Sequence, residues 1–109
     1  MTLDDLTVCL RALRLLAVDF GHLPAPDVDV STVFPERLRL SFHDASCASL
    51  AAFEQWRTAL GIAPDTVEAR TQSEGRTRVL AAEASFTGAV VMLTAYADQP
   101  AADRAGGVR

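Results

Sequence analysis

A chain of 109 residues has room for one domain with a single hydrophobic core, and 50% of its residues are hydrophobic. With 22% charged residues, the composition is that of a globular protein and excludes disordered and collagen-like classes. A net charge of -4 argues against general attraction to nucleic acids or anionic membranes but leaves room for a local basic patch, so we expect no membrane partner and do not favour nucleic acid. No apolar run is long enough to cross a bilayer, and Asp4 and Asp5 stand where a secretory signal would carry basic residues. We therefore expect a cytoplasmic protein.

The first predicted element is an amphipathic helix over residues 3–20, in which apolar residues recur three and four positions apart. Thr2 can cap this helix together with Asp5, and Gly21 and Pro24 favour its end. The predicted buried stripe is Leu3, Leu6, Leu10, Leu13, Ala17 and Phe20. Further apolar residues widen this face, so the helix either lies deep in the core or offers surface to a partner.

A period of two over residues 28–30 and 38–42 then predicts an antiparallel hairpin that turns near Pro35. A second helix follows, capped by Ser46 or Ser49 and ended by Gly61. Its predicted core stripe is Leu50, Phe53, Trp56 and Leu60. That spacing favours packing over a ligand pocket for the two aromatic residues.

The rest of the chain alternates again and predicts strands over residues 67–71, 76–86 and 89–97. The last strand contains the apolar run 90–93, which is typical of a strand that is central or covered on both faces. Residues 98–109 contain proline and glycine and predict a flexible tail.

The predicted order αββαβββ indicates an α+β fold: one five-stranded antiparallel sheet with both helices packed on one face. Residues 1–97 form the single predicted domain. Gly-x-x-Pro at 21–24 and at 61–64 follows each helix, which indicates either a duplicated helix-strand-strand unit or two ordinary helix ends.

The densest cluster of reactive side chains is His43, Asp44, Cys47 and Glu54. A cysteine beside a histidine and a carboxylate is the arrangement that activates a thiolate, so a thiol enzyme that uses Cys47 and His43 is a remote alternative. Capping of the second helix explains the same polar residues without any catalysis, and we favour that interpretation.

Cys9, His22, His43 and Cys47 supply the residue types of a zinc site, but they lack the close pairs that such sites use. We therefore predict no metal. The two cysteines form no paired motif, which favours a reducing compartment. The chain also lacks the glycine-rich phosphate loops and the common hydrolase motifs, so we predict no cofactor and no enzymatic activity.

Arginines on neighbouring predicted hairpins give the best hint of a ligand, because a guanidinium group binds phosphate or carboxylate with two parallel hydrogen bonds. The candidate ligand-binding residues are Arg39, His43, Arg70 and Arg78. Glutamates lie on the same hairpins, so cross-strand pairing on a solvated face is the competing interpretation.

Residues 36–44 and 50–61, a strand leading into an aromatic-bearing helix, resemble small uncharacterised proteins of high-GC actinobacteria, a group with no assigned activity. The resemblance implies a bacterial cytoplasmic setting. From the residues we predict a non-enzymatic domain that binds another protein or a second copy of itself, with a regulatory role. The alternative is a ligand- or nucleic-acid-binding module that uses the arginine-bearing sheet face.

Overall fold

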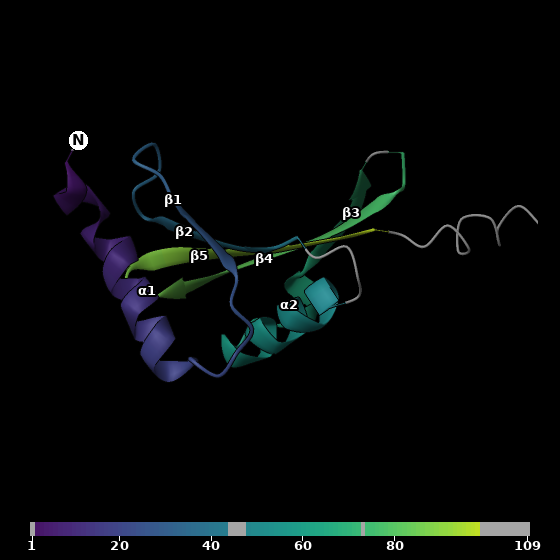
Figure 1. Cartoon of the computed structure of the whole chain (residues 1–109), viewed down its shortest axis with the longest axis horizontal. Coiled ribbons are helices and arrows are strands. Elements are labelled where there is room, and N and C mark those ends of the chain that lie inside the picture. The colour runs from purple at the N-terminus through teal and green to yellow at the C-terminus, as the bar shows by residue number, and fades with distance from the viewer. Residues whose placement is uncertain (1, 44–47, 73, 99–109) are drawn as a thin grey trace, which may run out of the picture.

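The computed structural model describes residues 2–43, 48–72 and 74–98 and shows two helices against a five-stranded sheet (Figure 1). The helical elements are η1 (Leu3–Leu6), α1 (Thr7–Asp19), α2 (Ala48–Ala59) and η2 (Pro64–Thr66). The strands are β1 (Asp27–Val30), β2 (Arg37–Phe42), β3 (Glu68–Gln72), β4 (Thr77–Phe86) and β5 (Ala89–Asp98). The α+β class is confirmed, and the short 3-10 helices η1 and η2 make the chain order differ from the simpler one predicted.

The predicted purely antiparallel sheet is wrong, because β2 pairs with β5 in parallel. The spatial order is β1-β2-β5-β4-β3, and the other three pairs are antiparallel. The connection through α2 makes this possible, since a helical crossover can return the chain in the direction in which it left. The most apolar strand, β5, takes the centre, whereas β3 is exposed along its whole length and takes an edge.

The register assigns every strand residue to one of two faces. Leu38, Leu40 and Phe42 of β2 point to the same side as alternate residues of β5, and these positions are buried. Figure 1 shows α1 and α2 on this side of the sheet. The opposite side, which we call the open face, is covered by neither α1 nor α2.

The core joins α1, α2, β2 and β5, with Phe53 and Trp56 of α2 buried as predicted. The predicted stripe of α1 is wrong in part, since Leu3 and Leu10 are 71% and 42% exposed. The helix instead buries Cys9, Ala12 and Leu16. The predicted stripe and the buried stripe lie on neighbouring sides of the helix. Both sides are apolar, so contacts with the rest of the fold decide which of them enters the core.

Local signals account for several element ends. The Thr2 backbone N–H donates to the Asp5 carboxylate at 2.7 Å, as the predicted cap requires. Ser49 lies inside α2 and is buried, so it is not the cap, and Ser46 lies outside the described residues.

At the C-terminal end of the described chain, β5 ends at Asp98, and residues 99–109 of the predicted tail lie outside the described residues. No described helix is long and apolar enough to span a membrane.

Candidate functional site

The four predicted ligand-binding residues do not share one surface. Arg39 and Arg70 lie on the open face, and His43 directly follows β2 with its ring against Tyr96 on that same side. Arg78 pairs with Thr71 and Ala97, which places it on the opposite face of the sheet. Because side chains alternate between the two faces along β4, Arg78 lies on the other side of the sheet from Arg39, His43 and Arg70.

The remaining three residues are also well separated. Arg70 pairs with Val79 of β4, Val79 pairs with Tyr96 of β5, and His43 stacks on Tyr96. With strands spaced about 4.8 Å apart, Arg70 and His43 are therefore roughly 14 Å apart across the sheet. Neither Arg39 nor Arg70 forms an ion pair with another described residue. The arginines thus present dispersed positive charges and do not converge on one small anion.

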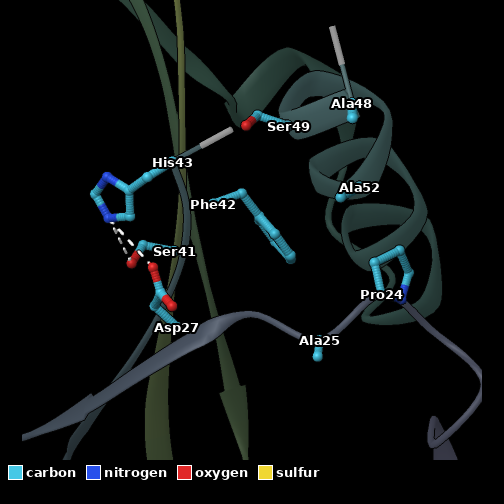
Figure 2. Close-up of a pocket in the computed structure, with 9 residues that line it drawn as sticks. All are labelled: Pro24, Ala25, Asp27, Ser41, Phe42, His43, Ala48, Ser49 and Ala52. Carbon is cyan, nitrogen blue, oxygen red and sulfur yellow. Dashed lines mark hydrogen bonds and ion pairs between the residues drawn. The ribbon is translucent and has the colours of Figure 1, made fainter. Parts of the chain in front are cut away.

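His43 forms the most organised polar group on this side, which we call the His43 corner (Figure 2). Its ring stacks on Tyr96, with centroids 4.6 Å apart and an angle of 10° between the planes. Its Nε2 atom lies 3.1 Å from Ser41 Oγ and 4.0 Å from Asp27 Oδ2. The corner borders a hollow of about 380 Å³ whose other wall includes Phe42 and Ala52.

The His43 corner has the residue types of a hydrolase triad but a different geometry. In a triad the carboxylate holds one ring nitrogen while the hydroxyl approaches the other. Here Asp27 and Ser41 both face Nε2. The arrangement can orient a polar ligand or fix the end of β2, and it does not set Ser41 up as a nucleophile.

The structure cannot place the predicted pair of Cys47 and His43, because Cys47 lies outside the described residues, as does Asp44 of the same cluster. Glu54, another member of that cluster, is paired with Arg57 on the next turn of α2. The hydrogen bond from Arg57 lowers the pKa of Glu54, and the positive charge adds to this effect. Glu54 therefore acts as a helix-surface ion-pair partner, and the thiol hypothesis stays a prediction.

Three of the four residues considered for a zinc site, Cys9, His22 and His43, are described by the structure, and they do not gather into a metal site. Cys9 is buried in α1, and its thiol donates a hydrogen bond to the Pro35 carbonyl oxygen at 3.0 Å. Burial, with a smaller contribution from the negative charge of Glu36, raises the pKa of Cys9. His22 is exposed in the loop after α1. Across residues 2–43, 48–72 and 74–98, no three histidine, cysteine or acidic side chains gather to hold a metal.

Sequence reasoning missed an apolar pocket between α1 and β1, which we call the α1–β1 groove. Its volume is about 180 Å³. Its lining residues are Leu13, Leu16, Ala17, Phe20, Gly21, Leu23, Pro24, Ala25, Pro26, Val28, Leu40 and Trp56. None of these side chains is charged.

Two contacts build the floor and the end of the groove. The Trp56 indole Nε1–H donates to the Pro24 carbonyl oxygen at 2.8 Å, which ties α2 to the loop that enters β1. At Gly21 a Cβ atom would lie 2.6 Å from the Ala17 carbonyl oxygen, so only glycine lets this loop turn so tightly off α1. The widened apolar face of α1 was the sequence signal for this surface.

Comparison with protein-family models, with curated proteins and with solved structures found no match for this chain. The resemblance to actinobacterial proteins stays a prediction from the sequence. The candidate surfaces for a function are the α1–β1 groove, the His43 corner and the open face of the sheet.

Proposed function

We propose that this protein is a non-enzymatic binding domain that recognises other proteins through the α1–β1 groove. The observation that carries the proposal is the apolar lining of the groove, which stays partly open to solvent: Val28 is 45% exposed at its rim. Grooves of this kind hold apolar anchor side chains of a partner.

The exposed side of α1 extends this apolar surface. Leu10, Leu13 and Ala17 follow one another at spacings of three and four residues, so they lie along one side of the helix. Leu13 and Ala17 line the groove, and Leu10 is 42% exposed one turn before them. A soluble domain that leaves such a stripe uncovered has surface suited to a protein contact.

A random peptide library displayed against the protein tests this proposal. Peptides that are selected should lose at least about tenfold in affinity for Ala17→Gln, because a long polar side chain then occupies the groove. Ala51→Gln is the matched control, since Ala51 is an exposed alanine of α2 that does not line the groove. Failure to select any peptide, or selected peptides that bind Ala17→Gln as tightly as the parent, would contradict the proposal.

The second candidate is binding of an anionic ligand or nucleic acid to the open face, favoured by the placement of Arg39 and Arg70 on that face. Such binding would weaken steeply with salt and would fall in Arg39→Ala and Arg70→Ala. Arg78→Ala is the control, because Arg78 lies on the other face. Equal loss in all three variants would contradict a site on the open face.

A further inference from the structure

β1 is an edge strand whose outer side has no neighbouring strand in the described part of the chain. Edge strands present unpaired backbone N–H and C=O groups, which can accept another strand. One side chain of this strand, Val28, also lines the α1–β1 groove. A segment that paired with β1 would therefore place alternate side chains beside the groove.

The side chains of β1 alternate between carboxylates and valines over Asp27–Val30. Asp29 lines a hollow of about 270 Å³ on the other side from the groove, together with Arg37 and Arg39 of β2. Asp29 forms no ion pair with another described residue, whereas Asp27 lies near His43. On the open face the edge thus offers the carboxylate of Asp29, which lies opposite Arg39 but forms no ion pair with it, and on the other face it offers an apolar rim.

The strand that already pairs with β1 shows which sequence this edge accepts. β2 reads Arg37-Leu38-Arg39-Leu40, with Arg39 opposite Asp29 and Leu40 opposite Val28. Arginine therefore meets aspartate on the open face, and leucine meets valine on the helix side. A strand with the same alternation on the outer side of β1 would repeat both matches.

We propose that β1 binds, by strand addition, an extended segment of a partner protein in which basic residues alternate with apolar ones. The inference rests on the proposed function and names the partner class for the α1–β1 groove. Basic side chains of the segment lie beside Asp29, and its apolar side chains enter the groove beside Val28. Backbone hydrogen bonds to the outer side of β1 hold the segment in register.

A second copy of this chain fits the edge poorly. If two β1 strands paired antiparallel, side chains on the same face would oppose each other, so aspartate would face aspartate in either permitted register. Like charges directly opposite each other destabilise strand pairing. Charge complementarity therefore selects a basic partner over self-association through β1.

The test uses a fluorescein-labelled eight-residue peptide of alternating arginine and valine, with fluorescence polarisation as the readout. The control peptide has four arginines followed by four valines, so its composition and charge are the same and only the alternation is lost. We expect the alternating peptide to bind at least about tenfold more tightly. N-methylation of every second amide on the pairing edge should remove binding.

Variants of the protein place the interaction on β1. Asp29→Lys should weaken binding of the arginine–valine peptide at least about tenfold and should create binding of a glutamate–valine peptide. Asp29→Asn should give a smaller loss and keeps the test valid if the charge reversal disturbs the edge. Asp65→Lys is the control, because it makes the same charge change at an exposed residue outside β1.

Equal binding of the two arginine–valine peptides, or binding that Asp29→Lys leaves unchanged, overturns the strand-addition inference. Self-association that Asp29→Lys relieves overturns it as well. If library peptides depend on Ala17 but not on Asp29, the groove binds proteins in another way, and only this inference fails. If they depend on neither residue, the proposed function fails too.

Discussion

Trp56 joins the groove to the core, so its replacement by phenylalanine and by alanine tests the packing described above. The side chain is 5% exposed and its indole N–H donates to the Pro24 carbonyl oxygen at 2.8 Å. Its ring also meets Phe20 edge to face, with centroids 6.3 Å apart. Phenylalanine keeps most of the ring and loses the hydrogen bond, whereas alanine loses both.

The expected costs follow from these contacts. An intramolecular hydrogen bond makes a net contribution of about 1 kcal/mol to the free energy of unfolding. An edge-to-face aromatic pair adds roughly 0.5–1.5 kcal/mol to what the burial of its surface contributes. Trp56→Phe should therefore lower the free energy of unfolding by about 1–2 kcal/mol. Trp56→Ala also leaves a cavity and should cost roughly 3–5 kcal/mol, which is a large share of the ~5–15 kcal/mol that holds a small domain folded.

Urea denaturation followed by far-UV circular dichroism measures both variants. Fluorescence is unsuitable because Trp56 is the only tryptophan in the chain. Gln55→Ala is the control, since Gln55 is exposed on the same helix and its replacement should change stability by less than about 0.5 kcal/mol. A Trp56→Ala protein as stable as the Gln55→Ala control would refute the assignment of this core.

Three further predictions concern local features. Thr87 has a φ of 48° in the two-residue turn between β4 and β5, a conformation that asparagine adopts more easily than a β-branched residue. Thr87→Asn should therefore raise the free energy of unfolding by about 0.5–1 kcal/mol. An unchanged or lower urea midpoint would contradict the assignment of this turn. The hydrogen bond from Arg57 lowers the pKa of Glu54, so this pair stabilises the fold at neutral pH and the effect is lost as pH falls through the lowered pKa. Glu54→Gln should accordingly be less stable than the parent at neutral pH and equal to it in strong acid, and equal urea midpoints at neutral pH would count against the pair. Burial raises the pKa of the Cys9 thiol, so in a Cys47→Ser background a disulfide reagent should label Cys9 only as urea unfolds the protein; prompt labelling in native buffer would show that Cys9 is accessible.

Much of the architecture is predictable from local patterns, because periodicity and turn residues act over a few positions. The two helices, the β1–β2 hairpin and the antiparallel β3–β4–β5 run all follow from such patterns. The parallel β2–β5 pair does not, since it joins segments separated by α2 and two further strands. Treating α2 as a crossover and β3 as too polar for the centre would have favoured the mixed sheet.

The candidate sites were less predictable, because they depend on how faces and edges meet. Arg78 looked equivalent to Arg70 in the sequence, and only the register puts them on opposite faces. The α1–β1 groove needs a loop that turns tightly at Gly21 and a tryptophan that holds Pro24, and neither contact leaves a local pattern. The surplus apolar residues of α1 were visible, but which of them would stay exposed was not.

The most direct test of the binding role is an NMR titration of the ¹⁵N-labelled protein with a library-selected peptide. If the α1–β1 groove and the β1 edge form the binding surface, the largest amide shifts should fall within residues 13–30. The Ala17→Gln protein, titrated with the same peptide, should need at least about tenfold more peptide to reach the same shifts. Largest shifts in β3 and β4, or an unchanged titration in Ala17→Gln, would contradict the account.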